Sequence, residues 1–210
     1  MTKAQDPEAF LSEAYHLPDD AAKLAFYQKW AVDYDRQMLE GLGYISATMI
    51  AQMLSEQVAD RAAGILDIGC GTGLTCSLLG EMGYRNLNGI DYSPDMLSVA
   101  ASREIYKNLT LADLNQPLEF ADHSFDAAIS SGTFTHGHVG AEPMDEIFRI
   151  LRPGGLLACT VHQELWQSKG FEDKFASLQQ AGIARQLSLH EGKFFRDGPV
   201  EGWVCLFQKI

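Results

Sequence analysis

The chain has 210 residues, of which 46% are hydrophobic and 21% are charged. This length and balance are typical of one globular domain, and they exclude a long disordered chain, a collagen-like repeat and a coiled-coil rod. Asp and Glu number 28 against 16 Lys and Arg, which gives a formal net charge of −12. Because a surface this acidic repels phosphate backbones, we expect no nucleic-acid partner.

The beginning of the chain, Met1-Thr-Lys-Ala-Gln-Asp-Pro, lacks the apolar core of a signal peptide. No apolar run reaches the roughly 18 residues of a membrane span. Cys70, Cys76, Cys159 and Cys205 form no C-x-x-C pair, and the small apolar neighbours of Cys70 and Cys159 are typical of buried thiols. We therefore expect a reduced, cytoplasmic protein without a membrane partner. The sequence leaves the oligomeric state open.

Residues 1–60 form a polar segment with helical periodicity. Leu24, Tyr27, Trp30 and Tyr34 recur at helical spacing, and after two glycines a second helix is expected over 44–59. This segment predicts a helical cap over 1–60 in front of a core over 61–210.

Short apolar runs alternate with amphipathic stretches from Gly64 onward. The runs are 65–68, 87–90, 109–112, 125–130 and 156–161. Between them lie helix signals, such as the N-cap Ser93 followed by Pro94. This alternation predicts a parallel sheet with helices on both faces, a Rossmann-like α/β fold. Two further strands, 184–195 and 202–209, lie on either side of a turn and are expected to end the sheet as an antiparallel pair.

A glycine-rich loop follows the first predicted strand. Gly69, Gly71 and Gly73 stand at alternate positions, where they allow a tight turn and a close approach of backbone to ligand. The dinucleotide fingerprint would have a glycine at Leu74, and the phosphate loop would need a lysine that is absent. The spacing thus favours a nucleoside ligand without a pyrophosphate, although a plain tight turn would use the same glycines.

Three acids accompany this loop at the ends of predicted strands. Asp91 follows the second strand, 18 residues beyond Gly73, where a carboxylate can accept both ribose hydroxyls. Asp113 follows the third strand, where an adenine amino group could bind. Asp67, within the glycine motif, could hold the loop or contact an ammonium group. Three acids around one glycine loop indicate a nucleoside site.

These motifs resemble those of class I S-adenosylmethionine-dependent methyltransferases over about residues 62–162. Asp67-Ile-Gly-Cys-Gly-Thr-Gly73 resembles the first motif of the family, and Gly89-Ile-Asp91 with Tyr92 and Met96 resembles the second. Ala112-Asp113-Leu114 resembles the motif at the adenine amino group. The resemblance implies a seven-stranded sheet with the last strand antiparallel, S-adenosylmethionine as cofactor and S-adenosylhomocysteine as product. The cofactor-binding residues it implies are Asp67, Gly69, Cys70, Gly71, Gly73, Asp91, Tyr92, Met96, Asp113, Leu114, Ser130, Tyr27, Trp30 and Tyr34.

Further segments resemble the Williams–Beuren-syndrome-region methyltransferase-like proteins. They are Tyr27-x-x-Trp30-x-x-x-Tyr34-Asp35, the segment from Ser131 to His138, and the closing 202–207. In this resemblance Tyr27, Trp30 and Tyr34 cover the cofactor, and aromatic faces can stabilise a sulfonium cation. A helix that only buries three aromatic side chains on the sheet is the alternative.

Three histidines follow strands whose ends face the predicted site. His136 and His138 follow the fourth strand and His162 follows the fifth, so they could line an acceptor pocket. With an ordinary pKa of about 6.5, an imidazole could accept a proton from the acceptor. His136 is the first candidate for this base and His162 the second. These side chains could instead only shape the pocket, and their spacing does not favour a metal site, so we expect no metal.

These observations predict methyl transfer from S-adenosylmethionine to a small, polar acceptor by in-line displacement. One alternative is a methyltransferase-like protein that binds S-adenosylmethionine or S-adenosylhomocysteine without turnover. The other is an NAD-dependent oxidoreductase, against which Leu74 argues.

Overall fold

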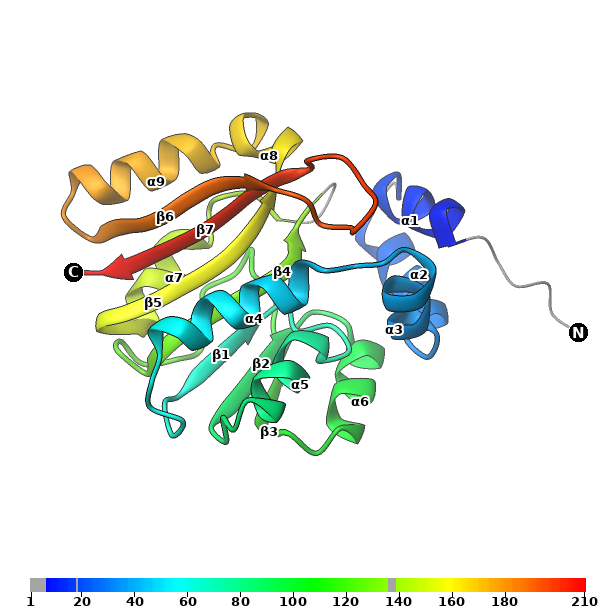
Figure 1. Ribbon diagram of the computed structural model, residues 1–210, viewed down its shortest axis with the longest axis horizontal. Coiled ribbons are helices and arrows are strands. Elements are labelled where there is room, and N and C mark those ends of the chain that lie inside the picture. The colour runs from blue at the N-terminus through cyan, green and yellow to red at the C-terminus, as the bar shows by residue number, and fades with distance from the viewer. Residues whose placement is uncertain (1–6, 18, 136–138) are drawn as a thin grey trace, which may run out of the picture.

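The computed structural model describes residues 7–17, 19–135 and 139–210. In this part of the chain, seven strands form one sheet in the order β3-β2-β1-β4-β5-β7-β6 (Figure 1). β7 pairs antiparallel with β5 and with β6, and the remaining pairs are parallel. The predicted Rossmann-like sheet with an antiparallel last strand is therefore confirmed. The strands are β1 Ile65–Ile68, β2 Leu87–Asp91, β3 Tyr106–Leu111, β4 Phe125–Phe134, β5 Leu151–His162, β6 Ala184–Gly192 and β7 Gly202–Lys209.

The helices begin where the sequence offers caps and end at turns. Ser93 caps α6, its side chain accepting a hydrogen bond from the backbone N–H of Met96 at 3.3 Å, and Pro94 occupies the first turn as predicted. The helix expected over 44–59 runs from Ser46 to Gln57. The helices are α1 Pro7–Tyr15, α2 Asp20–Trp30, α3 Tyr34–Arg36, the π-helical turn η1 Gln37–Gly41, α4 Ser46–Gln57, α5 Leu74–Glu81, α6 Pro94–Ser102, α7 Met144–Ile150, α8 Gln163–Ser168 and α9 Phe171–Gln180.

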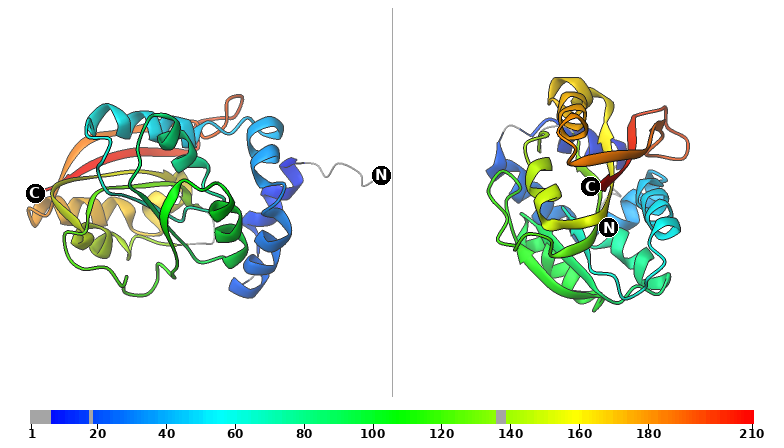
Figure 2. Two further views of the ribbon diagram at one scale, coloured as in Figure 1. Left: turned by 90° about the horizontal axis from the view of Figure 1, so that it is seen from below. Right: turned by 90° about the vertical axis from the view of Figure 1, so that its left-hand side faces the viewer.

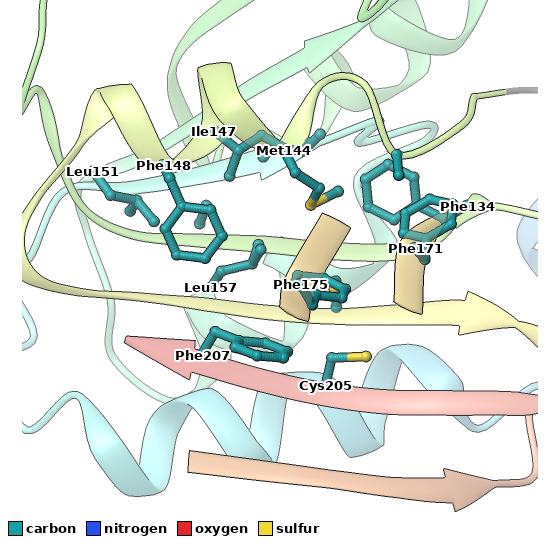
Figure 3. Packing of buried hydrophobic residues seen from close by; sticks show 14 of the residues in the cluster. Phe134, Met144, Ile147, Phe148, Leu151, Leu157, Phe171, Phe175, Cys205 and Phe207 are labelled. Carbon is teal, nitrogen blue, oxygen red and sulfur yellow. The ribbon is translucent and has the colours of Figure 1, made fainter. Parts of the chain in front are cut away.

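Apolar side chains hold helices on both faces of the sheet. On one face, Ile50 and Leu54 of α4 pack with Leu79 of α5 against β1 and β2. On the other face, the ring of Phe175 from α9 stacks on that of Phe207 from β7, with centroids 4.2 Å apart (Figure 3). Both layers exclude water from the sheet, which leaves the strand ends as the place for a polar site.

The N-terminal helices lie at one end of the sheet (Figures 1 and 2). Phe26, Trp30 and Met38 form a cluster there with Phe194 and Phe195 from the segment between β6 and β7. Main-chain hydrogen bonds join the two parts, since Ile45 N–H donates to the carbonyl of Phe194 and Arg196 N–H to that of Gly43, both at 2.9 Å. The segment before α4 and the segment between β6 and β7 are thereby fixed to each other at this end of the sheet.

Candidate functional site

A cleft with a volume of about 150 Å³ lies between the ends of the strands and the helices α2 and α3. It brings together predicted residues that are far apart in the sequence, from the glycine loop, from β2, from the segment after β3 and from the N-terminal helices. Those that line it are Gly69, Cys70, Gly71, Asp91, Tyr92, Met96, Asp113, Leu114, Tyr27 and Tyr34.

The three loop glycines serve different purposes. All have positive φ, of 64° at Gly69, 55° at Gly71 and 86° at Gly73. A Cβ at Gly69 would overlap Thr133, and one at Gly73 would lie 2.9 Å from the ring of Tyr106, whereas one at Gly71 would meet nothing within 4 Å. Gly69 and Gly73 thus accommodate neighbouring strands, and Gly71 exposes its backbone to the cleft.

The carboxylate of Asp91 holds the glycine loop and faces the cleft. One oxygen accepts the backbone N–H of Gly71 and the other that of Ser93, both at 2.8 Å. Burial raises the pKa of Asp91 above its ordinary value, while these hydrogen bonds act in the opposite direction. Each oxygen keeps a second lone pair, so this carboxylate can also accept hydroxyls of a ribose.

Asp67 lies behind the loop and is not among the residues that line the cleft. Its side chain is 1% exposed and accepts a hydrogen bond of 2.8 Å from the hydroxyl of Tyr106 in β3. Burial raises the pKa of Asp67 to about 6, against the effect of hydrogen bonds from Tyr106 and Cys76. Of the two roles considered for Asp67, this geometry favours holding the loop.

Two more predicted residues differ in their exposure to the cleft. Asp113 is exposed at the cleft edge, where Oδ1 accepts hydrogen bonds from the backbone and side-chain nitrogens of Asn115, both at 2.9 Å. Ser130 is fully buried, and its hydroxyl donates to the carbonyl of Ile68 at 2.8 Å. The next residue, Ser131, lines the cleft instead.

The aromatic residues of the N-terminal segment divide between two surroundings. Tyr27 and Tyr34 line the cleft, whereas Trp30 is 1% exposed between them and donates from Nε1 to Gln37 at 3.0 Å. The interpretation as a cleft wall therefore fits the two tyrosines, and Trp30 is a packed core residue that also reaches a neighbouring pocket.

Asp35 joins the N-terminal segment to the glycine loop. Its carboxylate accepts a hydrogen bond from the hydroxyl of Thr72 at 2.6 Å and forms an ion pair with Arg103. Arg103 in turn donates to the carbonyl of Thr72. Three segments that lie far apart in the sequence are thus connected directly beside Gly71.

Of the three histidines predicted to line an acceptor pocket, the structure describes only His162. His136 and His138 lie outside the described residues. His162 is buried at the start of α8, where its Nδ1 accepts the backbone N–H of Glu164 at 3.3 Å, and its ring lies 6.3 Å from that of Phe194. It is not among the residues that line the cleft.

Several cleft residues were not singled out from the sequence. Lys23 precedes Tyr27 by one helical turn, so the i, i+4 spacing on α2 could have indicated it. Tyr44 approaches the cleft from the segment before α4, and its hydroxyl lies 2.8 Å from that of Ser131. No local pattern marks Tyr44, because its contact depends on β4, which is remote in the sequence.

Metal ligation and membrane insertion find no support in this part of the chain. Among the described residues, no group of three or more His, Cys, Asp or Glu side chains could hold a metal ion. Nor is any helix there both long and apolar enough to cross a membrane.

Comparison with known proteins agrees with this geometry. Residues 66–159 match the methyltransferase domain family. Human methyltransferase-like protein 27 is 34% identical over 176 residues, which cover 81% of this chain and 71% of the human protein. The 18S rRNA (guanine(1575)-N(7))-methyltransferase of Saccharomyces cerevisiae is 40% identical over 87 residues, or 41% of this chain and 32% of the yeast protein.

Solved structures share the fold. A TehB-like S-adenosylmethionine-dependent methyltransferase from Corynebacterium glutamicum superimposes with a TM-score of 0.67 at 24% identity, over 89% of this chain and 99% of that one. A Haloferax volcanii protein in complex with the Trm112 methyltransferase activator superimposes with a TM-score of 0.65 at 18% identity, over 87% of this chain and 96% of that one.

The fold and the cleft define a class I methyltransferase, and the chain belongs to the S-adenosylmethionine-dependent methyltransferases. Its cofactor is S-adenosylmethionine, which sets aside the NAD-dependent alternative. The resemblance to the Williams–Beuren-syndrome-region methyltransferase-like proteins is confirmed as well, by the similarity to the human protein.

Proposed function

We propose that this methyltransferase acts on a small-molecule acceptor, with residues 1–60 as a cap over the cofactor cleft of the core 61–210. The observation that carries this proposal is the contact of Asp35 with Thr72 and Arg103, which holds the N-terminal helices against the glycine loop. A cleft closed in this way leaves room for a small acceptor at the strand ends.

The residues of the cleft fit S-adenosylmethionine. The open space at Gly71 and the carboxylate of Asp91 suit the aminoacyl and ribose parts, and Tyr92, Met96 and Asp113 suit the adenine. The faces of Tyr27 and Tyr34 suit a sulfonium, since they stabilise a cation without taking up a proton.

Bound S-adenosylmethionine supplies a methyl group that is already activated, so the protein contributes mainly alignment and exclusion of water. Positioning alone can account for roughly 7–11 kcal/mol of the barrier. His136 is the first candidate for a base that takes the acceptor's proton. His162 is the second, although its Nδ1 already caps α8.

An RNA acceptor is the second candidate, because relatives include 18S rRNA methyltransferases. However, the yeast match of 87 residues is too short to include both α2 and the segment between β6 and β7. The match therefore does not extend over both walls of the cleft, and the net charge of −12 disfavours a phosphate backbone.

The test is to incubate the purified protein with methyl-tritiated S-adenosylmethionine and a cell extract separated into metabolite, RNA and protein fractions. We expect label in the metabolite fraction. Label confined to RNA or protein would refute the small-molecule acceptor. Binding of S-adenosylhomocysteine without any transfer would favour the alternative of a non-catalytic binding protein. With the acceptor identified, unchanged turnover of His136→Ala would exclude His136 as the base.

A further inference from the structure

Three hydroxyl groups meet at the end of the cleft beside β4. The hydroxyl of Tyr44 lies 2.8 Å from that of Ser131, and the hydroxyl of Ser131 lies 3.0 Å from that of Ser46. Tyr44 and Ser131 line the cleft, whereas Ser46 is fully buried at the start of α4. These side chains form a hydroxyl chain that runs from the core to the cleft.

The hydroxyl chain lies on the side of the cleft opposite to the nucleoside residues. Asp91 ends β2 and Asp113 follows β3, and both strands lie on one side of β1. β4, which includes Ser131, lies on the other side of β1. A cofactor with its ribose at Asp91 would therefore extend its reactive end across the glycine loop toward the hydroxyl chain.

Main-chain contacts hold Tyr44 in place. Its N–H donates to the carbonyl of Met38 at 2.8 Å, and the N–H of the next residue, Ile45, donates to that of Phe194 at 2.9 Å. A Cβ at Gly132 would lie 3.0 Å from the Tyr44 hydroxyl, so a glycine at this position leaves room for the phenol against β4. The hydroxyl is thus fixed before a ligand arrives, which limits the loss of side-chain entropy on binding.

The hydroxyl chain has one hydrogen more than its internal bonds use. Three hydroxyls carry three hydrogens, and the two contacts between them use two. Among the described residues, Ser131 is the only hydrogen-bond partner of the Ser46 side chain, so the buried Ser46 hydroxyl donates to Ser131 and does not leave its hydrogen unpaired. The remaining hydrogen belongs to Tyr44 or Ser131 and is directed at the cleft.

The hydroxyl chain can donate this hydrogen bond, but it is not suited to take up a proton. Burial raises the pKa of Tyr44, and the charges of Glu201 and Asp67 add to this effect, so the hydroxyl stays neutral. In its described contacts the chain ends at Ser46 and reaches no carboxylate or imidazole. Its role is therefore to orient a bound molecule and not to act as the base.

A hydroxyl hydrogen without a partner destabilises a complex once the bound molecule has displaced water from it. The bound molecule must then present an atom with a lone pair to the hydroxyl chain. The nucleophilic atom itself is unsuitable, because the hydrogen bond would draw on the electron pair that attacks the methyl group. An oxygen beside the nucleophilic atom meets the requirement.

We infer that Tyr44 and Ser131 determine acceptor specificity, by donating to a carbonyl or carboxylate oxygen whose carbon is bonded to the nucleophilic atom of the acceptor. This inference rests on the proposed small-molecule function and deepens it by naming the class of acceptor. In the transfer, the electron pair of the nucleophile forms the bond to the methyl carbon, and the pair of the broken C–S bond stays on the sulfur. A proton released by the nucleophile passes to a group outside the hydroxyl chain, which only holds the neighbouring oxygen.

Variants in the tritium assay test this inference. Tyr44→Phe and Ser131→Ala, combined in one chain, remove the donor and should slow labelling of the metabolite fraction roughly tenfold or more. The control Tyr84→Phe removes a buried hydroxyl that contacts Arg61 and the carbonyl of Val58 and does not line the cleft, so labelling should keep its rate. Equal rates of labelling by the two variants would overturn the inference.

Identification of the product covers the case in which the double variant does not fold. The labelled metabolite, purified and identified by mass spectrometry, should carry the new methyl group on an atom bonded to a carbonyl or carboxyl carbon. A product methylated elsewhere removes this inference and leaves the small-molecule function standing. Absence of label from the metabolite fraction removes both.

Calorimetry separates the acceptor from the cofactor as the source of the oxygen. S-adenosylhomocysteine carries a carboxylate of its own, so it is titrated beside decarboxylated S-adenosylhomocysteine. We expect Tyr44→Phe to bind both as tightly as the unchanged protein does. A loss of affinity for S-adenosylhomocysteine alone would show that the hydroxyl holds the carboxylate of the cofactor, and would overturn the inference.

Discussion

Gly71→Ala separates the role of the glycine loop in ligand binding from its role in folding. Gly71 has a φ of 55°, and a Cβ placed there would contact nothing within 4 Å. Alanine in the left-handed region costs about 1–2 kcal/mol. The free energy of unfolding should therefore fall by only about that amount, because no clash adds to it.

Ligand binding should respond more strongly. The new methyl group would occupy the surface of the loop that faces the cleft, beside the backbone N–H that Asp91 holds. We expect the affinity for S-adenosylhomocysteine, measured by calorimetry, to fall tenfold or more, which corresponds to about 1.4 kcal/mol or more.

Two other glycines serve as controls. Gly182→Ala, at a φ of 68° and with equally open space, should show the same loss of stability and unchanged affinity. Gly69→Ala should lose about 1–3 kcal/mol more in stability, because its Cβ would overlap Thr133. If Gly71→Ala binds S-adenosylhomocysteine as well as Gly182→Ala does, the cofactor does not approach the loop at Gly71 and the assignment is wrong.

Two further substitutions test the surroundings of the loop. Because burial raises the pKa of Asp67 to about 6, the folded protein retains a proton there that the unfolded chain loses near pH 4. The free energy of unfolding should thus fall by about 3 kcal/mol relative to Asp67→Asn as the pH rises from about 4 to about 7, and parallel pH profiles from urea unfolding would contradict this. Asp35→Asn should weaken the contacts with Thr72 and Arg103, and so increase the rate of tryptic cleavage in α2 severalfold. Asp33→Asn, which removes only the exposed pair with Arg36, should not, and equal rates would show that Asp35 does not hold the helices.

The strands were predictable where they are buried on both faces. β1 coincides with the predicted run over 65–68, because a central parallel strand is buried along its whole length. β3 begins at Tyr106, three residues before the predicted run at 109, since this edge strand is largely exposed and includes Lys107 and Asn108. At the start of β5, the residues 152–155 interrupt the register with β4 as a bulge, and the predicted run over 156–161 begins only after them.

The site was predictable where one local motif positions its residues. Gly71 follows β1 and Asp91 ends the adjacent strand β2, and the carboxyl ends of parallel strands meet at one edge. Asp67 differs, because its partner Tyr106 lies in β3 and no spacing indicates this contact. Successive side chains of a strand point to opposite sides, so only one of two neighbouring serines in β4 can face the cleft. Ser130 donates a hydrogen bond beneath the loop and Ser131 lines the cleft, and this strand periodicity was available from the sequence.

The helix α2 combines two roles that the sequence presented as alternatives, because one of its aromatic side chains lines the cleft and another packs in the core. Trp30 is buried against Tyr34, with ring centroids 4.7 Å apart, and this packing fixes the helix on which Tyr27 faces the cleft. A tyrosine on an undocked helix would lose rotational and backbone entropy on meeting a ligand, and that loss would weaken binding. The core contacts of Trp30 therefore prepare the cleft, and replacing Trp30 should impair cofactor affinity even though its indole lies mostly outside the cofactor cleft.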